Sequence, residues 1–394
     1  MKLVVLLSRV PYPLEKGDKL RAYHQVRLLA ERNEVHLICL DDSGATEASK
    51  VHLSGLVKSL HIVPLNKGMI ALNMLRALVS ERPFQVHYFT QSQAVKKVNN
   101  LIDSIRPDHI YCQLIRTAEY VKHRHDVPKT LDYMDALNAG VRRRVDGASF
   151  IKKYFIKEEA QRLVRYENII FDYFDHHTII SFQDRELIFH KDRQKIVVIP
   201  NGVDSDYFQP LAESVPKFDI VFTGNMNYPP NIDGARRLSL EILPLLRKKK
   251  FNASLQIAGA TPAREVMELK DIDGVTVTGW VEDIRKSYAN AYVFVAPMRI
   301  GSGLQNKLLE AMSMGLPCVT TSLAANAFTT DQQSAFTVAD SNKEIVEAIE
   351  RLLMSDMMRK DFSLRGRALI EKDFRWSSTI DLLEKVFNEK KIEE

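Results

Sequence analysis

The stretch YVFVAPMRIGSGLQNKLLEAMSMGLPCVTT, residues 292–321, decides the expected fold of this 394-residue chain. It starts with an apolar strand that ends at Pro297. A loop with two glycines leads into a helix from about Leu304 to Met314, which Gly315 and Pro317 terminate. A second apolar strand follows. Strand, helix and strand in this order predict a parallel βαβ unit.

The same alternation extends in both directions from this stretch. We expect strands at 2–8, 35–40, 61–63, 108–112, 129–133, 177–180, 196–199, 219–223, 254–258, 275–278, 292–296 and 317–321, and helices at 19–31, 70–78, 93–105, 150–174, 232–247, 263–269, 283–289 and 304–314. The turn Pro200-Asn201-Gly202 interrupts the pattern. The expected fold class is therefore α/β, with two doubly wound, Rossmann-like domains facing across a cleft, 1–205 and 206–376. Residues 377–394 predict a C-terminal helix that crosses back to the N-terminal domain.

Composition excludes several classes of protein. The chain carries 55 Lys+Arg against 50 Asp+Glu, a net charge of +5, which is too small for a nucleic-acid-binding surface. The three cysteines show no disulfide or metal spacing, and no run of about 20 apolar residues predicts a membrane span. We therefore expect a cytoplasmic protein with no nucleic-acid partner.

Positive charge is concentrated in one segment. Residues 142–167 hold eight Lys/Arg and four Asp/Glu. Such a run is usually a solvated helix face. Contact with an anionic membrane surface, or with a lipid-linked diphosphate, is the alternative that we keep as a minor hypothesis.

The helix expected at 304–314 carries a polar stripe. Gly303, Asn306, Lys307 and Glu310 share one face, at positions i, i+3, i+4 and i+7. One interpretation is an exposed Lys–Glu pair. The other is a ligand site in which Lys307 meets a phosphate and Glu310 accepts hydrogen bonds from ribose hydroxyls.

The loop before this helix strengthens the second interpretation. It contains Arg299, Gly301, Ser302 and Gly303, directly ahead of the helix N-terminus. Exposed backbone N–H groups and the helix dipole favour an anion at such a place. Phosphate together with ribose indicates a nucleotide-sugar.

Five motifs resemble one family along nearly the whole chain. They are listed here in chain order: VPYPLEKGDKLRAYHQVRLLAERNEVHL (10–37), VIPNGVDSDYF (198–208), VFTGNMNYPPNID (221–233), GVTVTGWVEDI (274–284) and RIGSGLQNKLLEAM (299–312). Together they resemble the retaining family-4 glycosyltransferases of the GT-B fold, and within them an exopolysaccharide-type subgroup that includes exosortase-associated enzymes.

The resemblance implies an activity. It implies a hexosyltransferase-type enzyme that moves a sugar, with retention, from a nucleoside-diphosphate sugar to a hydroxyl of a glycan, a lipid-linked molecule or a small molecule. The pathway would be cell-surface polysaccharide or glycoconjugate synthesis. The N-terminal domain would take the acceptor and the C-terminal domain the donor. The nucleotide-sugar is then a substrate, and neither a cofactor nor a metal is expected.

The chain departs from the family pattern where the donor phosphates should bind. Of the family's two glutamates eight positions apart, the second matches Glu310 and the first falls on Ser302. The family's Arg after the first glycine of the C-terminal domain, and its nearby Lys, fall on Asn225 and close to Asn231, after Gly224. A diphosphate still requires cations. We therefore expect Lys307 and Arg299 to replace the missing pair.

Other site residues follow from the same resemblance. Gly17 matches the family's glycine loop near the donor phosphates, and Val281 lies in the segment whose backbone reads the nucleobase. Asp18, Arg21 and His24 are acceptor-side candidates, although Asp18 equally suits a helix N-cap and a helical histidine is more often structural.

One carboxylate in the N-terminal half is a catalytic candidate. Asp135 follows the strand expected at 129–133, where the family often carries a histidine. It would stabilise an oxocarbenium-like transition state or orient the acceptor hydroxyl. A helix N-cap is the alternative.

Two rival functions share parts of this pattern. A nucleotide-sugar 2-epimerase has the same two-domain architecture, and product analysis without an acceptor would distinguish it. A non-enzymatic sugar-binding protein is the second alternative.

Overall fold

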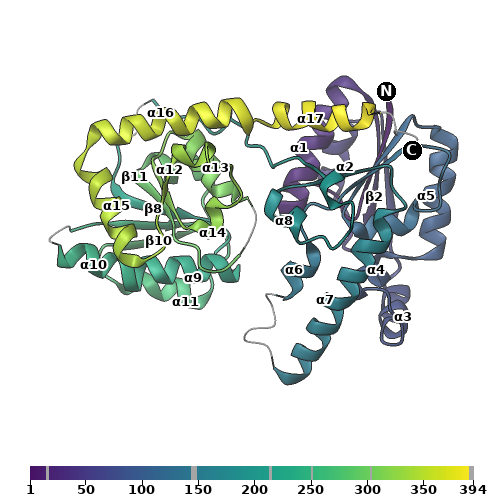
Figure 1. Ribbon diagram of the computed structural model, residues 1–394, viewed down its shortest axis with the longest axis horizontal. Coiled ribbons are helices and arrows are strands. Elements are labelled where there is room, and N and C mark those ends of the chain that lie inside the picture. Colours follow the sequence, from purple (N-terminus) through teal and green to yellow (C-terminus); the bar gives the residue numbers. More distant parts are fainter. Residues whose placement is uncertain (15–16, 143–148, 213–214, 250–251, 302–303, 390–394) are drawn as a thin grey trace. The chain divides into compact units, whose positions relative to one another are not determined.

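The structure is a computed structural model that describes residues 1–14, 17–142, 149–212, 215–249, 252–301 and 304–389. The chain forms two compact units (Figure 1). The first comprises Met1–Pro200 and Thr379–Glu394, and the second comprises Asn201–Ser378. The break therefore lies a few residues before the boundary expected at 205/206.

The first unit is built on a seven-stranded parallel sheet in the order β3-β2-β1-β4-β5-β6-β7. The strands are β1 (Lys2–Leu7), β2 (Glu34–Asp41), β3 (Ser59–Pro64), β4 (His109–Gln113), β5 (Lys129–Asp132), β6 (His176–Ile179) and β7 (Val197–Val198). Leu3 to Leu7 of β1 are almost completely buried, as an apolar run between two helical layers requires.

Helices cover both faces of this sheet. They are α1 (Gly17–Arg32), α2 (Glu47–Ser54), α3 (Lys67–Ala77), α4 (Phe84–Phe89), α5 (Ser92–Ile105), α6 (Leu137–Arg142), α7 (Phe150–Phe171) and α8 (Phe182–Glu186), with 3₁₀ turns η1 (Ile115–Tyr120) and η2 (Arg193–Lys195). The strand order reverses between β1 and β4, which makes their carboxyl ends the switch point of the unit.

The second unit repeats the design with a six-stranded parallel sheet, β10-β9-β8-β11-β12-β13. The strands are β8 (Phe218–Thr223), β9 (Leu255–Ala258), β10 (Val275–Gly279), β11 (Ala291–Ala296), β12 (Cys318–Thr320) and β13 (Thr337–Val338). The switch point lies between β8 and β11. Both expected doubly wound, Rossmann-like sheets are thus confirmed.

The helices of the second unit are α9 (Pro229–Arg237), α10 (Leu243–Lys248), α11 (Arg264–Met267), α12 (Ile284–Ala289), α13 (Asn306–Ser313), α14 (Ser322–Ala325), α15 (Asn342–Met354) and α16 (Asp356–Asp373), with 3₁₀ turns η4 (Glu268–Asp271) and η5 (Gln332–Ala335). A π-helical turn, η3 (Leu238–Ile242), joins α9 to α10. It lies just ahead of Pro244, which has no N–H to donate into a regular α-helical ladder.

The last helix, α17 (Trp376–Asn388), runs along the first unit over most of its length. Arg32 Nη1 bonds Asp381 at 2.5 Å and Glu384 at 3.0 Å. The Phe387 ring lies 4.7 Å from that of His109 on β4. Polar contacts and a buried aromatic ring therefore hold α17 against α1 and the sheet.

Candidate functional site

The carboxyl ends of β8 and β11 are adjacent in the second sheet, at its switch point. In an open parallel sheet, ligands bind outside the strands at this place, because the flanking loops leave in opposite directions. The loop after β8 begins at Gly224, and the loop after β11 leads to α13. The residues of interest belong to these two loops and to α13.

Lys307 lies in the first turn of α13. Leu308, Leu309 and Ala311 form the apolar side of the helix and are completely buried. Lys307 lies on the other side. Its Nζ donates a hydrogen bond to Asn231 Oδ1 and lies 4.5 Å from the centroid of the Phe222 ring. The structure therefore brings Lys307 to Asn231, close to the place where the resembling family has its lysine.

The charge of Lys307 is held in a water-poor place. Burial lowers the pKa of Lys307 to about 7, although the nearby Glu310 carboxylate acts in the opposite direction. Such an ammonium gains free energy from an anion that replaces its lost hydration. A phosphate oxygen is an anion of that kind.

Glu310 follows Lys307 by one helical turn. Its Oε2 accepts a hydrogen bond of 2.7 Å from the Tyr288 hydroxyl, and the Tyr288 oxygen lies 2.7 Å from Thr223 Oγ1. Because Tyr288 has one hydroxyl proton and gives it to the carboxylate, Thr223 donates to Tyr288. Burial raises the pKa of Glu310, opposed by Tyr288 and Lys307. A chain of hydrogen bonds from the end of β8 thus fixes the Glu310 carboxylate.

The loop after β8 depends on two glycines. Gly224 has φ +150°, and a Cβ there would lie 2.6 Å from Asn231 Nδ2. A Cβ on Gly259 would lie 1.7 Å from the Gly224 carbonyl oxygen. Asn225 is exposed and its Oδ1 accepts from Thr261 Oγ1 at 2.8 Å. The glycines therefore let two backbone segments pass closely and shape the loop beside Lys307.

The start of α13 presents backbone N–H groups. Among the residues that the structure describes, no side chain caps its first turn. Gly301, at φ +117°, packs beside Pro230, whereas Ser302 and Gly303 lie outside the described residues. Asn306, the first residue of the helix, accepts from Asn201 Nδ2 at 3.2 Å. The helix dipole favours an anion at this end.

Arg299 is placed differently from the expectation. Its guanidinium binds Asp233 (Nη2 to Oδ1, 3.0 Å) and Glu241 (Nη1 to Oε1, 2.9 Å), so carboxylates already neutralise it. A contact of Arg299 with the diphosphate therefore stays a prediction. Arg237 nearby supports the end of β11 by donating from Nη1 to the Pro297 carbonyl at 3.0 Å.

Val281 follows the end of β10. It is half-buried, beside Trp280, whose side chain is 71% exposed. Gly279, the last residue of β10, has φ +68° and turns the chain there. This segment remains the predicted nucleobase contact.

The predicted residues of the first unit occupy the start of α1. Gly17 is exposed, and Asp18 forms an ion pair of 3.0 Å with Arg9, which follows β1. His24 is buried, and its ring packs edge-on against Tyr23 at 5.4 Å. Asp18 and His24 therefore make contacts that a structural role explains.

For Arg21 the structure corrects the expected acceptor contact. The side chain is completely buried, and its Nε bonds Asp132 Oδ2 at 2.8 Å. The Tyr111 hydroxyl donates to the same carboxylate at 2.7 Å. Because a buried guanidinium must be paired, Arg21 ties α1 to the end of β5 instead of reaching a ligand.

Asp135 is exposed just after β5, and its N–H donates to the Tyr133 carbonyl at 2.9 Å. Its charge contributes to the raised pKa of the buried Glu167, about 8, whose main cause is burial. Asp135 belongs to the first unit and Lys307 to the second, so it remains a separate candidate.

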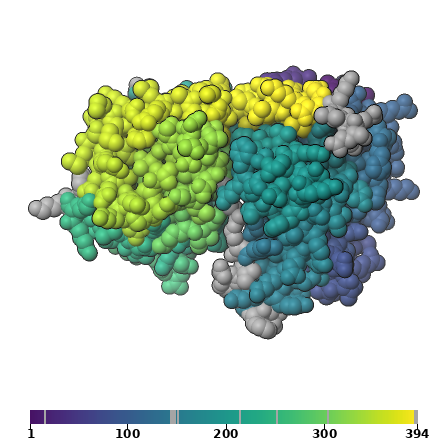
Figure 2. Space-filling view, in the orientation of Figure 1, coloured from purple at the N-terminus to yellow at the C-terminus, as the bar shows by residue number. Residues whose placement is uncertain are grey.

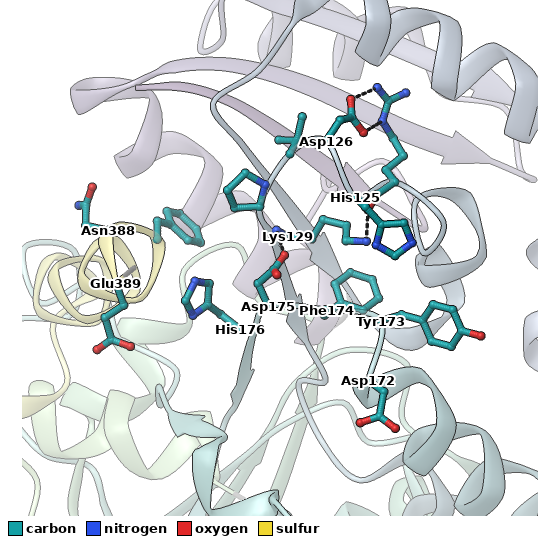
Figure 3. Close-up of a pocket in the computed structure, with 14 residues that line it drawn as sticks. His125, Asp126, Lys129, Asp172, Tyr173, Phe174, Asp175, His176, Asn388 and Glu389 are labelled. Carbon is teal, nitrogen blue, oxygen red and sulfur yellow. Dashed lines mark hydrogen bonds and ion pairs between the residues drawn. The ribbon is translucent and has the colours of Figure 1, made fainter. Parts of the chain in front are cut away.

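The first unit has a cavity of about 650 Å³ at the amino ends of its strands, whereas the predicted site residues lie near the carboxyl ends (Figure 3). Lys129 and His176, the first residues of β5 and β6, line it. Lys129 Nζ donates to the carbonyls of Val121, Lys122 and Arg124. The cavity is thus at the amino edge of the strands, away from the predicted site.

Tyr288 is the site residue that the sequence analysis missed. It stands in α12, outside the motifs that carried the prediction, and it is completely buried. Its hydroxyl is polar in an otherwise apolar position of a helix. That is a weak signal, since buried tyrosines commonly serve structure alone.

The chain has two parallel, doubly wound sheets, and the candidate ligand residues lie at the switch point of the second sheet. This arrangement defines a two-domain α/β protein of the GT-B class. Residues 217–355 match the family model "Glycosyl transferases group 1". A curated relative, the "Uncharacterized 44.6 kDa protein in cps region" of Klebsiella pneumoniae, is 26% identical over 95% of this chain and 96% of its own length.

Solved structures with the same fold cover nearly the whole chain. Sucrose-phosphate synthase from Thermosynechococcus elongatus has a TM-score of 0.68 at 14% identity, covering 98% of both chains. Anabaena Alr3699/HepE in complex with UDP has a TM-score of 0.68 at 12% identity, covering 98% and 99%. The structural likeness shows the GT-B fold, and the family match supports a glycosyltransferase.

The described residues show neither a metal cluster nor a membrane-spanning helix. They contain no group of three or more His, Cys, Asp or Glu side chains arranged to hold a metal ion. In the same part of the chain, no helix is long and apolar enough to cross a bilayer.

Proposed function

We propose that this protein transfers a sugar from a nucleoside-diphosphate sugar to a hydroxyl acceptor. The observation that carries the proposal is the position of Lys307, whose partly buried ammonium lies at Asn231 beside the loop after β8. In the resembling family this place is cationic. The diphosphate would bind Lys307 and the first N–H groups of α13.

The chemistry follows from the charge that develops during transfer. Breaking the bond between the anomeric carbon and the diphosphate leaves negative charge on the leaving group. Lys307 would neutralise that charge where water is scarce, and its effect would be largest in the transition state. Glu310, fixed by Tyr288, would accept hydrogen bonds from the ribose hydroxyls.

The finer features of the reaction are also proposals. Retention of configuration follows from the motif resemblance. A cell-surface polysaccharide or glycoconjugate pathway is supported by the cps-region relative. Anabaena Alr3699/HepE has been solved with UDP-glucose, which makes UDP the first nucleotide to test. We expect no metal requirement, so EDTA should leave the activity unchanged.

Asp135 is the proposed acceptor-side carboxylate. Asp135→Asn should lower kcat with little effect on UDP affinity, because Lys307 and Glu310 lie in the other unit. A change confined to UDP affinity would contradict this role.

The experiment that tests the proposal is UDP binding by Lys307→Ala, measured by calorimetry. Loss of a charge-assisted contact should weaken binding by at least tenfold. Lys270→Ala, at an exposed lysine of the same unit, is the matched control. Equal UDP affinity in both variants would overturn the role of Lys307, and absence of UDP, GDP and ADP binding by the unmodified chain would overturn the proposal.

A further inference from the structure

Helix α3 of the first unit packs Ile70 against the core but leaves other large apolar side chains exposed. Asn73 and Ala77 are its buried side chains, whereas Leu72 and Leu75 are exposed, Leu75 by 65%. Val79, two residues after the helix, is 92% exposed. A surface helix of a globular protein normally shows the reverse arrangement.

Specific hydrogen bonds hold α3 in this orientation. Asn73 Nδ2 donates to the Thr90 carbonyl at 2.7 Å, and Arg162 Nη1 of α7 donates to the Ala77 carbonyl at 2.5 Å. Rotating the helix to bury its leucines would break the first bond and leave Asn73 in solvent. The outward apolar face is therefore a fixed feature of the fold.

The N-terminal part of α7 adds exposed aromatic and basic side chains. Tyr154 and Phe155 are 66% and 43% exposed, and the Phe155 ring packs 6.3 Å from that of Phe84. Arg162, which binds the end of α3, also stacks on Phe84 at 4.8 Å. Phe84, the first residue of α4, thus contacts α7 through Phe155 and Arg162, and Arg162 also binds the end of α3. Figure 1 shows α3 and the start of α7 in the lower part of this unit, and Figure 2 shows the same view in space-filling form.

We define the α3–α7 surface as the exposed side chains of residues 67–79 and 152–157. These two stretches contain five Lys/Arg, which are Lys67, Arg76, Lys152, Lys153 and Lys157, and no Asp or Glu. A second copy of the chain would bring like charges together, which disfavours self-association through this surface. Exposed apolar groups surrounded by cations fit an anionic lipid bilayer instead.

We propose that the α3–α7 surface docks this protein on an anionic membrane. Leu72, Leu75 and Val79 enter the interfacial region, while the lysines meet lipid phosphates. The inference moves the membrane hypothesis from the basic segment 142–167 to a surface that combines α3 with only the start of α7. It does not depend on the proposed transfer reaction.

The experiment is co-sedimentation of the full chain with phosphatidylcholine vesicles that contain either no phosphatidylglycerol or about 30 mol% of it. Each is measured at low and at high salt. We expect binding to the anionic vesicles that weakens with salt. Leu75→Gln/Val79→Gln should lose at least tenfold in affinity. Lys152→Glu/Lys153→Glu should lose more than tenfold, because each cation near an anionic surface contributes about fivefold.

Val51→Gln, at another exposed valine of the same unit, is the matched control and should bind like the unmodified chain. Thermal unfolding and UDP binding of every variant check that the fold and the second unit are unchanged. No binding to anionic vesicles would overturn the proposal, as would equal binding by Leu75→Gln/Val79→Gln. Concentration-dependent self-association that the same variant abolishes would reassign the surface to contacts between copies.

Discussion

Lys307 couples ligand binding to pH. Its pKa of about 7 lies below the ordinary 10.5, so between these values the unfolded chain holds the proton more tightly than the folded one. The unliganded protein therefore gains stability from this group as the pH rises from 7 toward 10.5. An anionic ligand acts in the other direction because it favours the charged lysine.

The first prediction follows from this coupling. Above pH 7, UDP must bind together with a proton, so its affinity should fall as the pH rises, with a slope approaching tenfold per unit. Calorimetry between pH 7 and 9 measures the slope. Lys307→Arg, which stays charged, should flatten it. An unchanged slope in that variant would show that another group titrates.

The second prediction concerns Tyr288, which we regard as a positioning residue for Glu310. Tyr288→Phe removes the 2.7 Å hydrogen bond to Oε2 and leaves the carboxylate less well oriented. We expect the preference for UDP over 2′,3′-dideoxy-UDP to fall about tenfold, since a hydrogen bond to a charged group contributes about 1.5–3 kcal/mol.

Two comparisons separate positioning from stability in that experiment. Glu310→Gln should lose the same discrimination, whereas Tyr292→Phe, on β11 of the same unit, should keep it. Equal loss of UDP and dideoxy-UDP affinity in Tyr288→Phe would point to a structural role only.

At the scale of elements, the βαβ alternation was predictable because apolar runs and helical periodicity are local properties of the sequence. β1 and α13 lie within a few residues of their expected bounds. Helices α15 and α16 were not foreseen, although Ser341 and Glu344 form a capping box at the start of α15. The expectation for 232–247 missed the π-helical turn that lies just ahead of Pro244.

The site was predictable only where the pattern was local. The spacing of Lys307 and Glu310 on one helix indicated a shared face, and both lie at the switch point. Arg299 shows the limit, because its carboxylate partners Asp233 and Glu241 come from α9 and η3, which no spacing along the loop reveals. Arg21 shows the same limit through its partner on β5.

The third prediction tests the link between α1 and β5. Arg21→Met leaves the buried Asp132 carboxylate without its cation and should lower the free energy of unfolding by about 3–5 kcal/mol, measured by urea denaturation. Arg21→Met/Asp132→Asn should recover part of that loss, because the uncompensated charge is gone. If Arg21→Met unfolds normally but loses acceptor affinity, Arg21 serves the acceptor after all.

Among the described residues, the buried apolar side chains form three clusters, one in the second unit and two in the first. The cluster in the second unit includes Phe222, Phe294 and Leu308, and the clusters of the first unit include residues of α17 such as Ile380 and Leu383. Because Lys307 and Glu310, the residues proposed to bind the nucleotide, both belong to the second unit, a nucleotide should stabilise the two units unequally.

The fourth prediction is that UDP protects the second unit selectively. At a UDP concentration 100 times Kd, binding stabilises the folded unit by about 2.7 kcal/mol. For a unit of this size that corresponds to a rise of about 5–11 °C in one calorimetric transition. Hydrogen exchange of the full chain should localise the protection to residues 223–310, including α13, and Lys307→Ala should remove it. Because Asn225 and Asn231 stand where the resembling family has cations, protection that survives in Lys307→Ala would mean that backbone N–H groups alone hold the diphosphate. Protection confined to Met1–Pro200 would contradict the proposed roles of Lys307 and Glu310, which lie in the second unit.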